Sequence, residues 1–263
     1  MGIAVLITIT VFIATTAGSI SGIGGGVLIK PVLDAITDMP AGVISFLSGI
    51  TVLTMTVVSL LRSRKGEQEI SNVTLFLAIG AAVGGVAGKK IFDMIKTSAG
   101  NDAMVSLIQN IVMVILTVAV FVYTVRKETI STKNVENKVV VIICGLGLGM
   151  LSSFLGIGGG PINLMFLSYL FSMDTKTAAL NSLFVIFFSQ VLSLATTLVT
   201  GSVPEFDVTI LILMMVFAVA GATLGRSLSK KMSGKNVDIL FMILMAVIIG
   251  LSVYNCFRFG RLI

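Results

Sequence analysis

Several residue types on which protein chemistry often depends are scarce or missing in this chain of 263 residues. It contains no histidine and no tryptophan, and its two cysteines, Cys144 and Cys256, lie far apart in apolar segments. Without histidine or clustered thiols the sequence offers little for general acid–base catalysis, a metal site or a disulfide. We therefore expect no catalytic residue, no bound metal and no cofactor.

Charged residues are also scarce. Only 11% of the residues are charged, 56% are hydrophobic, and the mean hydropathy is +1.09, a composition that excludes a soluble domain of this length. Uncharged runs such as 1–29 and 139–173 match or exceed the about 20 helical residues that cross the hydrocarbon core. They lack the alternation of transmembrane β-strands. The sequence predicts an all-α integral membrane protein.

The cations that are present favour the lipid bilayer as a partner and not nucleic acid. The net charge is +6, but the Lys and Arg residues lie in short connections between apolar runs, as the positive-inside rule expects. No basic residue precedes Lys30, so the first apolar run lacks the n-region of a signal peptide. We interpret that run as a retained helix.

The chain contains an internal duplication. "SGIGGG" at 21–26 returns as "LGIGGG" at 155–160, an offset of 134 residues. Two later similarities, which pair Ser45 with Ser182 and the glycine pair of 84–88 with that of 221–225, have an offset of 137, so we expect three inserted residues before them. The predicted units are repeats at 1–125 and 139–263, joined by a polar cytoplasmic linker at 126–138.

Each repeat is expected to contain five helical segments in the same order. These are 3–19, 27–36, 41–61, 71–88 and 103–125 in the first repeat, and 139–154, 161–172, 177–200, 208–225 and 237–257 in the second. The second segment of each repeat has about ten to twelve residues and reaches only about half way across a bilayer at 1.5 Å per residue. We therefore predict a glycine-broken or re-entrant element plus three longer transmembrane helices in each repeat.

Loop charges indicate that the two repeats are inverted. The connection at 62–69 holds three cations, whereas its counterpart at 201–207 holds none, so the two are expected on opposite sides, the first in the cytoplasm. The linker and the loop that starts at Arg226, each with four cations, are then cytoplasmic too. The presumed loop at 89–98 does not fit, because its three cations would face outward.

The glycine motifs suggest an anion site. We expect each motif to end one helix and to open the N-terminus of the next, whose free N–H groups and partial positive charge suit an anion. Pro161 fits the first helical position of the second short segment. Two such N-termini would meet near the membrane centre. Close helix packing is the alternative, and we adopt it for the glycine pairs Gly84/Gly88 and Gly221/Gly225.

Several polar side chains could complete this site. Lys30 is either a cation of the substrate site or a snorkelling anchor or partner of Asp34. Asn163, Asn181, Ser45 and Ser182 are either donors to an anion or interhelical contacts. The predicted substrate-binding residues are Gly22, Gly24, Gly25, Gly26, Lys30, Ser45, Gly156, Gly158, Gly159, Gly160, Asn163, Asn181 and Ser182.

Other polar residues are assigned differently. We expect Gln109 and Gln190 to make interhelical contacts. A coupling proton or ion would have to use carboxylates near segment ends, and the candidates Asp34, Asp38 and Asp174 are expected mainly in loops.

The motifs "SGIGGGVLIKP" and "LGIGGGPINLMF", placed in two repeats of about 130 residues with "GATLG" in the fourth segment, resemble the TauE/SafE family of sulfite exporter-like membrane proteins. The resemblance implies a bacterial-type plasma-membrane transporter of sulfite, organosulfonates or other small sulfur-containing anions.

The leading hypothesis is therefore a secondary transporter that alternates access around a midplane site, with a small anion as its substrate. A passive anion channel would use the same helix N-termini. A membrane enzyme of sulfur metabolism is opposed by the missing acid–base and metal-binding residues.

Overall fold

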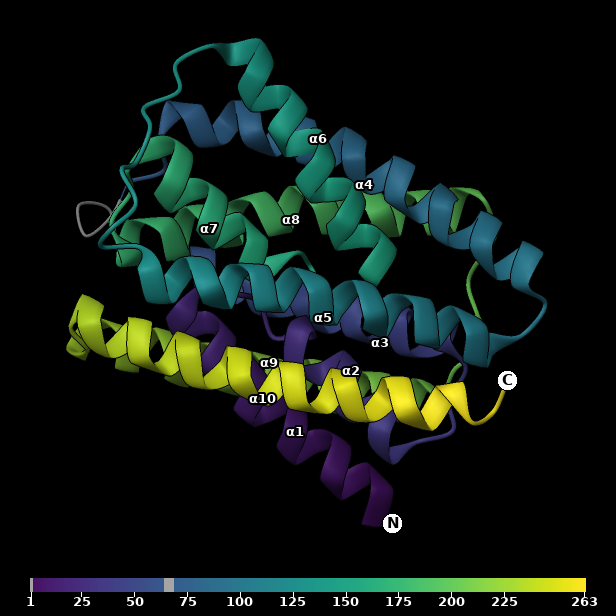
Figure 1. The fold of residues 1–263 in the computed structure, drawn as a ribbon. Helices are drawn as coiled ribbons and strands as arrows, with labels where there is room; N and C mark the ends of the chain where they lie inside the picture. Colours follow the sequence, from purple (N-terminus) through teal and green to yellow (C-terminus); the bar gives the residue numbers. More distant parts are fainter. Residues whose placement is uncertain (1, 64–68) are drawn as a thin grey trace.

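The structure, a computed structural model, describes residues 2–63 and 69–263, which form ten α-helices (Figure 1). In the first repeat these are α1 (Gly2–Ser21), α2 (Gly26–Ile36), α3 (Ala41–Leu61), α4 (Asn72–Ala99) and α5 (Asp102–Arg126). In the second repeat they are α6 (Lys138–Leu155), α7 (Gly160–Phe171), α8 (Thr175–Val199), α9 (Val208–Lys231) and α10 (Gly234–Gly260).

Eight of these helices are long and apolar enough to cross a membrane; α2 and α7 have only 11 and 12 residues. Large apolar side chains such as Ile13, Val83 and Ile143 are more than half exposed, as lipid-facing positions require. The all-α membrane-protein prediction is confirmed.

The prediction of a loop at 89–98 is wrong. α4 continues past Gly88 to Ala99 and ends at Gly100, whose φ of 60° provides a left-handed C-cap. An i,i+4 ion pair between Lys89 and Asp93, with 2.7 Å between Nζ and Oδ1, stabilises this extension. The charges that suggested a loop therefore belong to the last turns of a helix.

Small residues bring α4 against α6 and α9 against α1. A Cβ atom added to Gly84 would lie 2.1 Å from the Leu146 carbonyl oxygen, and one added to Gly221 would lie 2.7 Å from the Phe12 oxygen. Such distances leave room only for glycine, so the predicted close-packing role of these glycines is confirmed. In each case the fourth helix of one repeat packs against the first helix of the other.

The two glycine motifs lie directly against each other between the repeats. A Cβ atom at Gly26 would approach the Ile157 oxygen to 2.6 Å, and one at Gly160 would overlap the Ile23 oxygen. α1 ends before the first motif and α2 begins within it, and α6 and α7 flank the second motif in the same way. Gly24 and Gly158 have φ values of 75° and 83°, which L side chains rarely adopt.

These contacts correct the pairing of Ser45 with Ser182. A Cβ atom at Gly156 would meet Ser45, whereas one at Gly22 would meet Ala179, so the structural counterpart of Ser45 is Ala179 at an offset of 134. The match of two short apolar stretches was displaced by three residues, or about one helical turn. Because the fourth helices still pair at 137, the three extra residues fall between the third and fourth helices of the second repeat.

The linker ties the start of α6 to the end of α7. The backbone N–H of Lys133 donates to the Tyr169 oxygen over 2.7 Å, and the N–H of Val135 donates to the Leu170 oxygen over 3.0 Å. α6 and α7 therefore form a helical hairpin whose outer ends lie together, with the second glycine motif at its turn.

Candidate functional site

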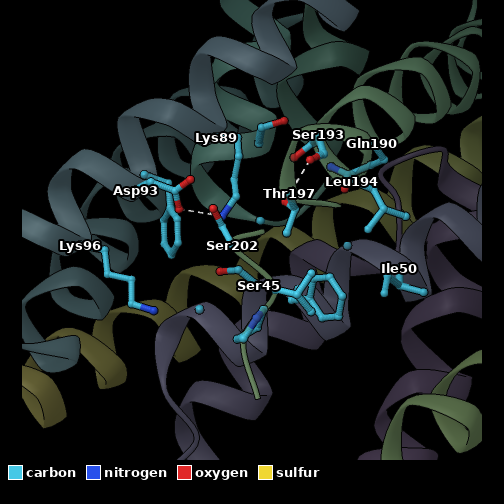
Figure 2. Close-up of a pocket in the computed structure, with 18 of the residues that line it drawn as sticks. Ser45, Ile50, Lys89, Asp93, Lys96, Gln190, Ser193, Leu194, Thr197 and Ser202 are labelled. Carbon is cyan, nitrogen blue, oxygen red and sulfur yellow. Dashed lines mark hydrogen bonds and ion pairs between the residues drawn. The ribbon is translucent and has the colours of Figure 1, made fainter. Parts of the chain in front are cut away.

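A cavity of about 490 Å³ lies among the first half of α3, the last turns of α4 and the second half of α8. Gly156 of the second glycine motif and residues 202–204, from the connection between α8 and α9, complete its wall. Figure 2 shows side chains from these separate elements pointing toward a common space. The cavity is therefore built from both repeats.

Two lysines from the α4 extension give the cavity a positive charge. Lys89 is paired with Asp93, and its Nζ also lies 5.0 Å from the centre of the Phe92 ring. Lys96 lies one to two turns further on and reaches toward Gly42, near the start of α3. With Asp93 as the carboxylate among the described lining residues, the cavity has one excess positive charge.

Neutral donors face the same cavity without partners. Ser45 Oγ, Ser153 Oγ and Gln190 Nε2 are buried atoms that make no hydrogen bond to any described residue. A buried polar group left unpaired costs about 1–3 kcal/mol, so three of them in one cavity wall call for an explanation. An oxyanion, which accepts several hydrogen bonds, would satisfy all three donors together.

Most of the predicted substrate-binding residues do not line this cavity; Ser45 and Gly156 do. The remaining glycines of both motifs are buried against protein: Gly22 against Ala179, Gly25 against Thr15 and Gly159 against Ser152. The structure thus brings the two motifs together, while anion binding at their helix N-termini stays a prediction.

Lys30 is buried in α2 as the partner of Asp34. Its Nζ lies 3.1 Å from Asp34 Oδ2, and both side chains are at most 2% exposed. Asn110 Nδ2 donates to the same carboxylate over 2.9 Å, and Asn255 Nδ2 donates to the Pro31 carbonyl oxygen over 2.8 Å. The ion-pair alternative therefore describes Lys30, and the expectation that Asp34 lies in a loop is wrong.

The other two candidate carboxylates do lie outside helices. Asp38 follows α2 and accepts a 2.6 Å hydrogen bond from Arg258 Nη2. Asp174 is the N-cap of α8 and accepts from the backbone N–H groups of Lys176 and Thr177.

The predicted polar residues of α7 and α8 divide into different roles. Asn181 accepts hydrogen bonds from the Ser71 N–H and the Thr74 hydroxyl, and Ser182 Oγ donates to the Gly22 oxygen over 2.7 Å. Both therefore make interhelical contacts. Asn163 is buried, and its Oδ1 has no partner among the described residues.

The interhelical prediction for the two glutamines holds for one of them. Gln109 Nε2 donates to the Phe154 oxygen of α6 over 2.6 Å, as expected. Gln190 instead lines the cavity, where its Nε2 is unpaired among the described residues.

Lys89, Lys96 and Ser153 were not predicted as site residues. One signal in the sequence pointed to the lysines, because three cations on a segment expected to face outward violate the positive-inside rule. A cation that violates this rule has a reason to be there, and the cavity supplies one.

These features define a multi-pass helical membrane protein with a cation-lined polar cavity at one end of its helix bundle. The chain matches the family model of the sulfite exporter TauE/SafE over residues 7–252, and it belongs to that family. No curated protein and no solved structure matches it. Membership makes it a membrane protein of a transporter family and confirms the resemblance seen in the glycine motifs.

Proposed function

We propose that this protein is a secondary transporter that exports a small sulfur-containing anion, such as sulfite or an organosulfonate, across a bacterial-type plasma membrane. The anion binds in the cavity between α3, α4 and α8. The observation that carries the proposal is the combination, in one cavity, of Lys89 and Lys96 with three buried donors that lack protein partners.

The chemistry of the cavity matches such an anion. A lysine ammonium attracts a sulfonate or sulfite group by charge, and the hydroxyls and the amide can donate to its several oxygens. A volume of about 490 Å³ lies within the usual range of small-molecule sites and has room for an organic substituent on the sulfur. Asp93 tempers the positive charge, which favours release of the anion as well as binding.

Helix contacts support an inverted arrangement of the repeats. Arg226 of α9 contacts Ser63 after the end of α3, while Lys89 of α4 shares the cavity with Thr197 near the end of α8. α3 and α4 are consecutive and end at opposite ends of the bundle (Figure 1). α3 and its counterpart α8 must then end on opposite sides, which is the relation of an inverted repeat.

In this mechanism the repeats rock around the paired glycine motifs. Gly156 borders the cavity, so movement of the second motif reaches the bound anion directly. The helix N-termini that follow both motifs add partial positive charge toward the centre of the bundle. We place the inner end of the substrate path there.

The test is flux of radiolabelled sulfite, sulfate, thiosulfate and sulfoacetate in proteoliposomes, with and without anion on the other side and with a pH gradient. A transporter gives saturable flux that an anion on the trans side accelerates, whereas a passive channel gives no trans-acceleration. Lys89→Gln should abolish the flux. Lys235→Gln, which removes an exposed lysine from the first turn of α10, is the matched control and should leave the flux unchanged.

A further inference from the structure

We propose that a set of basic and hydroxyl side chains at the other end of α3 is a second anion-binding site, which opens to the opposite side of the membrane when the described cavity closes. The set consists of Ser19, Ser59, Ser63 and Arg226. This inference rests on the proposed function, because it names the residues that receive the same anion in the opposite-facing state.

The serines of this set are the repeat counterparts of cavity residues. The glycine-motif contacts relate α1 to α6 and α3 to α8 at an offset of 134 residues. Ser19 therefore corresponds to Ser153, and Ser59 corresponds to Ser193. Both counterparts line the cavity.

The basic residue of the set has a counterpart as well. α4 and α9 are related at an offset of 137, since Gly88 and Gly225 make equivalent contacts with α6 and α1. Arg226 directly follows Gly225, as Lys89 directly follows Gly88. The duplication thus keeps a cation at both positions, although the two repeats otherwise differ there.

The equivalent serines are in different states in the two repeats. Ser19 Oγ and Ser59 Oγ are hydrogen-bonded to each other over 2.8 Å, and Ser19 also donates to the Ala222 oxygen over 3.2 Å. Both side chains are fully buried. Their counterparts lie on a cavity wall, where Ser153 Oγ is unpaired among the described residues.

The two cations differ in the same way. Arg226 is only 4% exposed, and its Nη2 donates to Ser63 Oγ over 3.2 Å. The counterpart of Ser63 at an offset of 134 is Thr197, which lines the cavity together with Lys89. An interaction that closes one end of the bundle thus corresponds to an opened space at the other.

Position along α3 puts the two sets at opposite ends. Ser45 borders the cavity near the start of the helix, and Ser59 lies 14 residues further along, or about 20 Å at 1.5 Å per residue. Two packings built from equivalent residues, one open and one collapsed, are what a single end state of an alternating-access carrier looks like. Exchange of the two packings between the repeats would open the second set and collapse the first.

The second site would bind the anion differently from the first. Arg226 presents a planar fork that can donate two parallel hydrogen bonds to a sulfonate or sulfite, whereas Lys89 acts as a compact point charge. We therefore expect Arg226→Lys to retain part of the transport and Arg226→Gln to lose it.

Thiol labelling tests the opening directly. In a background with Cys144→Ala and Cys256→Ala, single variants Ser59→Cys and Ser252→Cys are exposed in membrane vesicles to a membrane-impermeant methanethiosulfonate. Both serines are 0% exposed, so a static structure predicts equal protection. We expect Ser59→Cys to react at least about tenfold faster than Ser252→Cys, and only from the side that carries the 62–69 connection.

Equal labelling rates for these two variants would overturn the proposal, as would reaction of Ser59→Cys from the same side as Ser193→Cys. The labelling does not depend on the identity of the anion, so it is separate from the flux assay. If Lys89→Gln transports normally, the proposed function fails. If Lys89→Gln is inactive but Arg226→Gln keeps full flux, only the second site fails.

Discussion

Two buried lysines, Lys30 and Lys89, lie in membrane-spanning parts of the bundle with very different surroundings. Lys30 is held by Asp34, and further amides complete the hydrogen bonding around that carboxylate. Lys89 has Asp93 as a partly exposed partner and lies beside buried donors with no partner among the described residues. A buried polar cluster that is satisfied within the protein maintains the fold, whereas one that is left unsatisfied is suited to bind something else.

Breaking the satisfied cluster should have the largest effect. Asp34→Ala leaves the Lys30 ammonium buried without its partner, and we expect about 3–5 kcal/mol of destabilisation. Thermal unfolding of the detergent-solubilised protein would measure this loss. Transport should fall because less folded protein remains.

The double variant Lys30→Met with Asp34→Leu provides the control. Apolar side chains of similar size remove both charges, so we expect part of the lost stability to return. A double variant less stable than Asp34→Ala would show that the ion pair is not the reason for the loss.

Substitution in the unsatisfied cluster should separate function from stability. Lys89→Gln removes a charge-assisted interaction of about 1.5–3 kcal/mol with the anion, which corresponds to about a 10- to 100-fold loss of binding. We expect the unfolding temperature to change little. Isothermal titration with the transported anion would measure the affinity, and a large drop in unfolding temperature with unchanged affinity would reverse the comparison.

The sequence predicted the helices well because the determining signals are local. Apolar runs set the spans, and the consecutive glycines set the ends of α1 and α6 within two residues. The cavity could not be predicted in the same way, because it depends on how α4 lies against α3 and α8. Lys89 and Lys96 belong to a charged helical extension whose composition is typical of a loop.

The register of the repeats shows the same limit at higher resolution. Short apolar stretches match almost as well when displaced by one turn, so sequence similarity paired Ser45 with Ser182. The contacts of Gly22 and Gly156 resolve this ambiguity, because each glycine leaves room for only one neighbouring backbone position. The equivalence of Ser59 with Ser193 depends on that correction.

A milder substitution tests whether the unpaired donors await a ligand. Ser153→Ala removes a buried hydroxyl without a partner among the described residues, so we expect stability to stay the same or to rise by up to about 1 kcal/mol. Anion affinity should fall about three- to fivefold as one hydrogen bond is lost. Thermal unfolding and titration on the same sample would reveal the opposite signs. Ser19→Ala, which breaks the bond to Ser59, should instead lower stability.

The smallest expected effect concerns a carboxylate outside the membrane-spanning segments, which extends the comparison to a solvated partner. Burial raises the pKa of the Asp174 carboxyl, but hydrogen bonds from Thr177 and Lys176 outweigh it and hold that pKa below its ordinary value of 3.8. A lowered pKa in the folded state means that the carboxylate stabilises the fold above pH 3.8 and loses this effect as the pH falls through the folded pKa. Asp174→Ala should therefore cost about 1 kcal/mol at neutral pH through loss of the α8 N-cap, and less in strong acid. Thermal unfolding of both proteins across this pH range would measure the difference, and a gap that widens toward low pH would contradict the assigned cap.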